Sequence, residues 1–236
     1  MNPGDALAQI AESQIGTRGD LQSGRTALYG YLLATDAKLS AFEPEWARRG
    51  FGADAASRYS LFNQGSNERE RTARFRLLDA EASVPEFSML LHMHSWCAAF
   101  VDWCVLQLLL KSPHTTSLTL THRPRTASAF GLLHWGMTSD CYVSKDHRTA
   151  PERGDIAVFN FLHGHHSTHH TGIVTQPGRG GFYSVEGNTT PGKGGNQGYL
   201  VAKRWRAQAV LKGFIRLPPR DRLGDYNISS RVSHTG

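Results

Sequence analysis

The spacing of apolar residues along the chain changes near residue 150. Before that point apolar positions follow a helical spacing. Residues 5–15 predict a short amphipathic helix capped by Asp5 and ended by Gly16. A nearly unbroken apolar run at 97–110 predicts a buried helix, and residues 126–135 predict a shorter one closed by Gly136.

After Pro151 the spacing becomes that of strands, with turn-forming glycine and proline between the apolar runs. The expected strands are residues 156–161, 171–175, 182–186, 199–205 and 212–217. Helices followed by a meander predict an α+β fold, in which N-terminal helices pack on an antiparallel sheet of about five strands.

We expect residues 1–217 to form a single domain with an elaboration at 21–94, followed by a polar C-terminal tail at 218–236. Within the elaboration, residues 68–76 alternate in charge at spacings that favour an exposed helix over a nucleic-acid patch.

The formal net charge of +6 indicates anionic partners, among which charge alone does not choose. The first ten residues lack the basic and apolar regions of a signal peptide, and no segment is apolar over the length of a membrane span. We therefore expect a protein made in the cytoplasm, without a membrane span, which another route delivers if it acts elsewhere.

Cys97 lies where the buried helix begins, with Ser95 as a possible N-cap. Unpaired backbone N–H groups and the helix dipole would stabilise a thiolate there, so Cys97 is a candidate nucleophile; the alternative is a small core residue. Cys104 lies two turns further on, which indicates a core residue and excludes a disulfide with Cys97.

A cysteine nucleophile needs a base that a third group orients. Among the histidines of residues 163–170, only His170 opens a strand-like run. Glu186 and Asn188 lie two apart on the next strand, and they face His170 if paired residue numbers sum to an even value. Glu186 could instead be a surface carboxylate.

The other histidines of this run, at positions 163, 165, 166 and 169, could form a zinc or nickel site. A polar loop is favoured, because no cysteine or carboxylate in the run completes a ligand spacing. We expect no metal and no cofactor.

Five segments, taken in order and spacing, resemble the CHAP amidases, which belong to the papain-like NlpC/P60 superfamily of peptidoglycan hydrolases. The segments are Trp96-Cys97-Ala98-Ala99-Phe100-Val101, Gly154-Asp155-Ile156-Ala157-Val158-Phe159, His170-Thr171-Gly172-Ile173-Val174, Val185-Glu186-Gly187-Asn188-Thr189 and Gly213-Phe214-Ile215-Arg216. The resemblance covers residues 95–217 well and does not cover 21–94.

The resemblance implies the papain-like NlpC/P60 (CHAP) fold and a role for each matching residue. Cys97 would be the nucleophile, His170 the general base and acid, Glu186 the group that orients the imidazole, and Asn188 a second polar support. The backbone N–H of Cys97 would be one oxyanion donor. Relatives often carry a glutamine just before the cysteine as another donor, but residues 92–95 here read His-Met-His-Ser.

The implied substrate is peptidoglycan, cut through a thioester at an amide bond. With no signal peptide, no wall-binding repeat and an extra segment at 21–94, we favour an antibacterial effector delivered to rival cells by a contact-dependent, type VI-like secretion system. Its expected partners are an immunity protein and a secretion-system component. The alternatives are a phage-type endolysin with the same chemistry, or a non-catalytic envelope-binding or metal-binding module.

Overall fold

The computed structural model describes residues 2–18, 27–28, 30–31, 34–35, 96–145, 149–161, 170–190 and 198–220. Its helices are α1 (Pro3–Glu12), α7 (Cys97–Lys111) and α8 (Ala129–Thr138). Its strands are β1 (Tyr142–Ser144), β2 (Ile156–Phe159), β3 (His170–Gly178), β4 (Gly181–Thr189), β5 (Leu200–Ala207) and β6 (Leu211–Ile215), with the short 3-10 helix η3 (Gln208–Val210) before β6.

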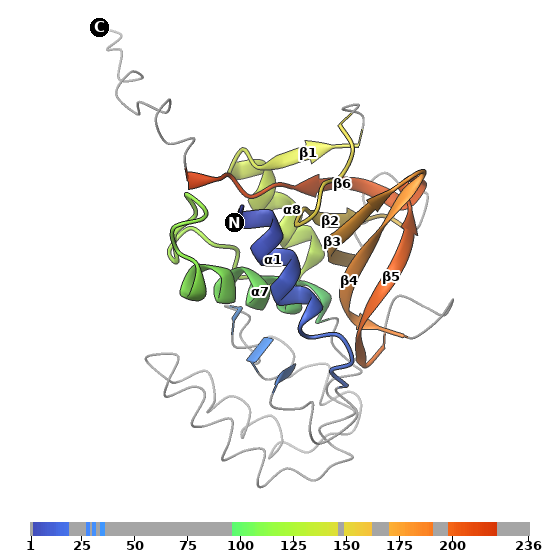
Figure 1. Ribbon diagram of the computed structural model, residues 1–236, viewed down its shortest axis with the longest axis horizontal. Coiled ribbons are helices and arrows are strands. Elements are labelled where there is room, and N and C mark those ends of the chain that lie inside the picture. The colour runs from blue at the N-terminus through green and yellow to red at the C-terminus, as the bar shows by residue number, and fades with distance from the viewer. Residues whose placement is uncertain are drawn as a thin grey trace, which may run out of the picture.

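The strands form one sheet in the order β1-β6-β2-β3-β4-β5, in which every neighbouring pair is antiparallel (Figure 1). The expected α+β layout is therefore confirmed, and it is consistent with a papain-like fold. The sheet has six strands rather than about five. The additional strand, Tyr142–Ser144, has three residues, which is too short to show an alternating pattern in the sequence.

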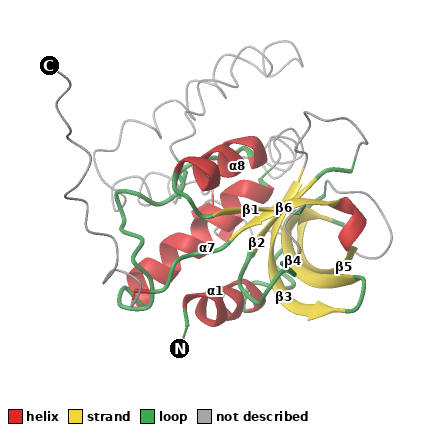
Figure 2. Ribbon diagram, turned by 90° about the horizontal axis from the view of Figure 1, so that it is seen from above, coloured by secondary structure: helices red, strands yellow, loops and turns green. Residues whose placement is uncertain are grey.

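The two faces of the sheet carry different cores. On one face Ile156, Val158 and Val185 pack under α1 and α7, which lie along this side of the sheet (Figure 2). On the other face Ala157, Phe159 and other apolar side chains form a second core. Successive residues of a strand point to opposite faces, so β2 contributes to both cores and its four residues are all buried.

Helix α1 begins earlier than the sequence pattern predicts. Its N-cap is Asn2, whose side-chain Oδ1 accepts from the Asp5 backbone N–H at 2.7 Å, so the prediction of Asp5 as the cap is wrong. Pro3 occupies the first turn, where its missing N–H costs nothing. The helix ends at Glu12, and Gly16 follows with a positive φ of 91°.

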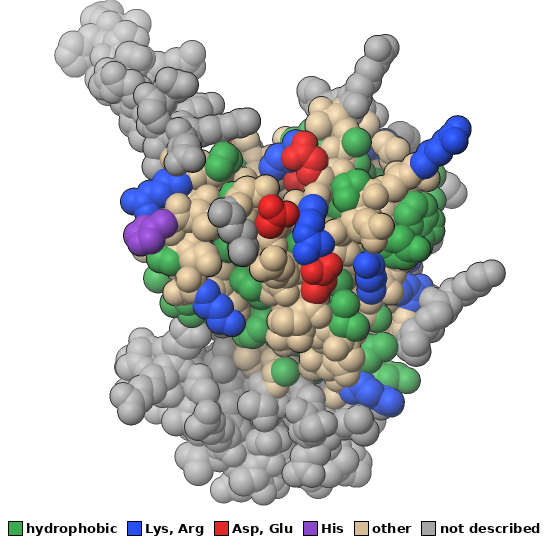
Figure 3. Space-filling model, viewed as in Figure 1, with side chains coloured by type: hydrophobic (Ala, Val, Ile, Leu, Met, Phe, Trp, Pro, Cys, Tyr) green, Lys and Arg blue, Asp and Glu red, His purple; other side chains and the backbone are tan. Residues whose placement is uncertain are grey.

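Ion pairs hold α1 to the start of β2. The Arg153 guanidinium donates to Glu12 at 2.6 Å and lies 3.6 Å from Asp5. Figure 3 shows basic and acidic side chains side by side over α1, so on this face the net positive charge does not form a continuous basic patch of described residues.

Helix α8 is also shifted from its predicted position. The Ser128 side chain caps it by accepting from the Gly131 N–H, and Gly136 lies within the helix rather than closing it. A Cβ at Gly136 would lie 2.6 Å from a side-chain carbon of Ile215. The glycine therefore serves close packing of α8 on β6, and its interpretation as a helix end is wrong.

Several predictions concern residues that the structure does not describe. They are the charged helix at 68–76, most of the elaboration at 21–94 and the tail beyond residue 220. The domain boundaries accordingly stay predictions. None of the helices in the described ranges is long and apolar enough to span a bilayer.

Two glycines with positive φ allow a comparison of backbone strain with crowding. A Cβ at Gly154 would lie 2.1 Å from the Gly4 Cα, whereas a Cβ at Gly16 would have no neighbour within 4 Å. We expect Gly16→Ala to lower the free energy of unfolding by about 1–2 kcal/mol, the cost of the left-handed conformation. Gly154→Ala should lower the free energy of unfolding clearly more, because its Cβ would also collide with Gly4 of α1. Urea unfolding measures both variants, and equal losses would contradict this close contact between α1 and the turn before β2.

Candidate active site

The first residue of α7 is Cys97, which confirms that this cysteine lies in the first helical turn. The N-cap is Trp96, without a side-chain capping bond, and Ser95 lies outside the described residues. The first helical hydrogen bond runs from Phe100 N to Trp96 O, so the N–H of Cys97 falls outside the helical ladder. The helix start thus presents backbone donors and a positive dipole beside the thiol.

An aromatic cluster fixes this helix start. The Tyr31 ring stacks on Trp96 at 5.9 Å between centroids and meets Phe100 edge-on at 5.3 Å. Strand β4 passes directly over the same turn, because a Cβ at Gly187 would lie only 2.6 Å from Phe100 Cβ. Gly187 therefore lets the strand that carries Glu186 approach the helix that carries Cys97.

His170 opens β3 and lies opposite Phe159 of β2. At this end of the β3–β4 hairpin Ile173 pairs with Val185, so paired residue numbers sum to an even value, as the expected register requires. His170 Nε2 lies 2.8 Å from Glu186 Oε2, and both side chains are fully buried. The structure thus brings together the two residues that the sequence pattern placed on facing strands.

The path of the Glu186 side chain depends on Gly172. The even register sets Glu186 opposite Gly172, which lies two residues along β3 from His170 on the same face of the sheet. A Cβ at Gly172 would lie 2.6 Å from Glu186 Cγ. The missing side chain therefore leaves room for the carboxylate to lean across β3 and reach the imidazole.

Two further residues, which sequence reasoning missed, complete the surroundings of Glu186. Arg206 donates from Nε to Oε1 at 2.7 Å and from Nη2 to Oε2, and the Ser184 hydroxyl donates to Oε1 at 2.6 Å. With His170, four donors bind this carboxylate. The sequence does contain a signal for this cluster. Polar and charged residues occupy alternate positions on two paired strands, with Ser184 and Glu186 on β4 and Arg204 and Arg206 on β5.

These contacts determine the charge of both residues. Burial alone would raise the pKa of Glu186, but hydrogen bonds from Arg206 and His170 outweigh it and lower the pKa to about 2. Burial alone would lower the pKa of His170, but the charge of Cys97 and the interactions of the ring with Cys97 and Glu186 raise it to about 9. At neutral pH the pair is therefore a carboxylate and an imidazolium. An ionised carboxylate only accepts, so Nε2 is the donor.

The other ring nitrogen of His170, Nδ1, is the one left to interact with the thiol. Nε2 is occupied by Glu186, so the interaction of the ring with Cys97 falls to Nδ1. Nδ1 has no hydrogen bond of ordinary geometry, which fits a catalytic contact that tightens only when substrate binds. The arrangement suits a thiolate–imidazolium pair. Because Cys97 is only 1% exposed, a substrate reaches the sulfur only when the surrounding atoms move aside.

Asn188 lies beside this chain of contacts, in the bulge where the β4–β5 register shifts. It is 3% exposed and has a positive φ of 55°, a conformation that asparagine tolerates better than most residues. Its role as a second polar support stays a prediction.

Cys104 lies in the core that packs under α1 and α7, and burial raises the pKa of its thiol well above the usual range. The histidines at positions 163, 165, 166 and 169 lie outside the described residues, so the choice between a polar loop and a metal site stays open. No group of three metal-ligating side chains occurs among the residues that the structure describes.

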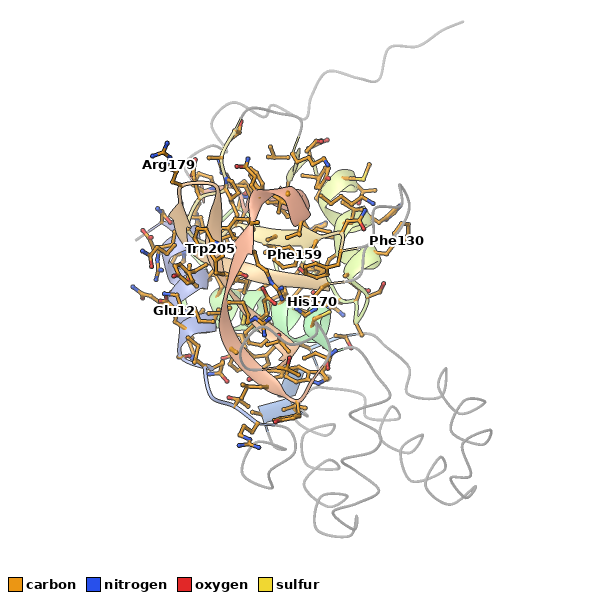
Figure 4. The ribbon with its side chains drawn as sticks, turned by 90° about the vertical axis from the view of Figure 1, so that its right-hand side faces the viewer. Glu12, Phe130, Phe159, His170, Arg179 and Trp205 are labelled. Atoms are coloured by element: carbon orange, nitrogen blue, oxygen red, sulfur yellow. The ribbon has the colours of Figure 1, made fainter. Side chains whose placement is uncertain are left out.

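In Figure 4 Phe159 and His170 lie within the body of the molecule, while Trp205 lies toward its edge. The segment from the helix start to the end of β4 is also where the chain matches a known family. Residues 91–188 match the model of the CHAP domain. This segment of the chain is similar to a CHAP domain. No curated protein and no solved structure matches significantly.

The matched segment of the CHAP domain includes Cys97, His170, Glu186 and Asn188. It stops before β5, so Arg206 lies beyond it. A CHAP domain implies amidase or endopeptidase activity on peptidoglycan, which agrees with the expectation from the sequence.

The contact between Glu186 and His170 predicts how the imidazole titrates. Glu186→Gln removes a negative charge that stabilises the imidazolium, so the pKa of His170 should fall below about 9. Asp155→Asn is the matched control, because Asp155 is also a buried carboxylate bound by an arginine, Arg216. Nuclear magnetic resonance of the His170 ring against pH measures both. An unchanged titration in Glu186→Gln would contradict the assigned contact.

Proposed function

We propose that the protein is a cysteine hydrolase that cleaves amide bonds of bacterial peptidoglycan through a thioester intermediate. The observation that supports it most is the buried chain from Glu186 to His170 to Cys97, with the cysteine at a helix start. The match to the CHAP family supports the substrate class.

In the proposed acylation step, the Cys97 sulfur attacks the amide carbonyl carbon and the C–N bond breaks. The His170 imidazolium gives its proton to the leaving amine. Glu186 stays ionised and holds the ring by its other nitrogen, as an orienting carboxylate does in a catalytic triad. The step yields a thioester at Cys97 and a free amine.

In the proposed deacylation step, neutral His170 accepts a proton from water, whose oxygen attacks the thioester carbonyl. The C–S bond breaks, the carboxylic acid product leaves and releases its proton to solvent, and the thiolate–imidazolium pair returns. The Cys97 backbone N–H lies outside the helical ladder and is one donor for the oxyanion in both steps. The second donor is undefined, because residues 92–95 lie outside the described part of the chain.

We also propose that the enzyme acts in the periplasm of rival cells after delivery by a contact-dependent, type VI-like secretion system. The long segment at 21–94, nearly all of which precedes the matched residues 91–188, is the feature that fits loading or recognition by an immunity protein. A neighbouring gene whose product blocks lysis on co-expression would support this route. A neighbouring holin gene would support a phage endolysin instead.

The proposed chemistry predicts different effects for two buried cysteines on one helix. Cys97→Ala should abolish the release of amine and carboxylate ends from purified peptidoglycan, because it removes the nucleophile. Cys104→Ala should keep substantial activity, since its thiol lies in the core two turns away. Mass spectrometry of the released fragments measures activity and identifies the bond, and circular dichroism checks folding. Equal losses in the two folded variants would refute the assignment.

Inhibition separates this chemistry from the two alternatives. Iodoacetamide should inactivate the enzyme and EDTA should not, because the nucleophile is a thiolate. Inactivation by EDTA with recovery in zinc would favour a metal mechanism. Binding to the wall without any released fragment would favour a non-catalytic module.

A further inference from the structure

Arg206 binds the orienting carboxylate of the site from a strand outside the matched CHAP segment. Its Nε and Nη2 donate to the two different oxygens of Glu186, a bidentate geometry that fixes both position and orientation of the carboxylate. Arg206 is 8% exposed and Glu186 is fully buried, so water does not screen the pair.

The same guanidinium also contacts the aromatic rings that flank His170. It lies over Phe159 at 5.5 Å and over Phe161 at 4.8 Å from the ring centroids. His170 packs against these two rings at 5.9 and 6.1 Å between centroids. Arg206 and His170 are therefore held by the same two rings and by the same carboxylate.

We propose that Arg206 is a positioning residue of the site, which keeps Glu186 ionised and fixed so that the carboxylate orients His170 without taking its proton. The consequence for catalysis rests on the proposed hydrolase function. The effect on the protonation of Cys97 and His170 does not rest on that function, because it concerns the protein without substrate.

The proton between Glu186 and His170 can lie on either residue. A carboxylate and an imidazolium without solvent can exchange a proton and become a neutral pair, which burial favours. Arg206 opposes this exchange, because it bonds directly to both oxygens of the anion and reaches the imidazole only through the carboxylate and the two rings. Its hydrogen bond is the largest of the influences that lower the pKa of Glu186.

The charged groups around His170 come from three described elements. Cys97 of α7 and Glu186 of β4 contact the ring, and Arg204 and Arg206 lie on β5. Arg204 donates to the backbone oxygen of Thr190 rather than to the carboxylate in the contacts described. From β2 and the residues after it, the ring meets only Phe159 and Phe161 in the described contacts.

The test is the rate at which iodoacetamide alkylates Cys97, measured against pH by mass spectrometry. A Cys141→Ser background removes the free cysteine that is only partly buried. In Arg206→Gln, Glu186 should take up a proton at acidic pH. The imidazolium of His170 then loses the carboxylate that stabilises it, and the thiolate of Cys97 loses the imidazolium in turn. We expect the acid limb of the profile to move up by at least about one pH unit. Arg206→Lys keeps the cation without the bidentate geometry and should move it in the same direction by less.

Arg216→Gln is the matched control. Arg216 binds Asp155 through the same Nε and Nη2 pair, at 2.9 and 2.8 Å, on a different part of the sheet. Its loss should lower stability and leave the acid limb in place. If Arg206 has only a structural role, Arg206→Gln should behave as Arg216→Gln does, with lower stability and an unchanged acid limb.

A double variant shows whether Arg206 acts through Glu186. Glu186→Gln with Arg206→Gln should give the acid limb of Glu186→Gln alone, because no carboxylate is left to protonate. It also removes the uncompensated buried charge that endangers the fold of Arg206→Gln. If Arg206→Gln does not fold, Arg206→Lys carries the comparison.

A wild-type acid limb in the folded Arg206 variant, or a further shift in the double variant, would overturn the proposal. Because alkylation needs no wall substrate, failure of the proposed function is seen separately. A shifted acid limb in a protein that releases nothing from peptidoglycan would keep the role of Arg206 and reject the hydrolase.

Discussion

The Glu186 carboxylate carries a negative charge with no exposure to solvent. An isolated charge in such a place costs several kcal/mol, so the surrounding strands must supply donors. Arg206 and Ser184 do so from β5 and from β4 itself, and His170 does so from β3. The requirement fixes the register of three strands at once, because a slip of one residue would turn a donor to the opposite face.

Two glycines make this arrangement compatible with a nucleophile on a helix. Gly172 leaves space for the carboxylate over β3, and Gly187 leaves space for β4 over the first turn of α7. His170 then lies between the buried acceptor and the thiol at the helix start. The cysteine gains a positive dipole from its own helix, α7, and a cationic neighbour from β3, which is far away in the sequence.

Sequence patterns predicted the parts of the site that depend on local rules. A long apolar run located the start of α7 at Cys97, and period-two spacing put His170 and Glu186 on facing strands. Arg206 was missed because β5 reverses the usual preference: Trp205 is 46% exposed while its charged neighbour is buried. That reversal is explained by the carboxylate on the next strand and by the two aromatic rings that the guanidinium covers.

The errors in the fold have similar causes. Asn2 rather than Asp5 caps α1, since both residue types are good caps and only the backbone path chooses between them. Gly136 looked like a helix end, but its reason is the contact with Ile215, which is distant in sequence. Apart from β1, the elements were thus predictable from local pattern, whereas these close contacts between them were not.

The most direct test of the central claim is to trap the acyl-enzyme. The enzyme is mixed with soluble peptidoglycan fragments, quenched in acid within the first turnovers and analysed by peptide mass spectrometry. The account predicts an acyl group on the peptide that contains Cys97, which hydroxylamine removes as it does a thioester. Release of products with an acyl group on another residue, or by a folded Cys97→Ala variant, would contradict it.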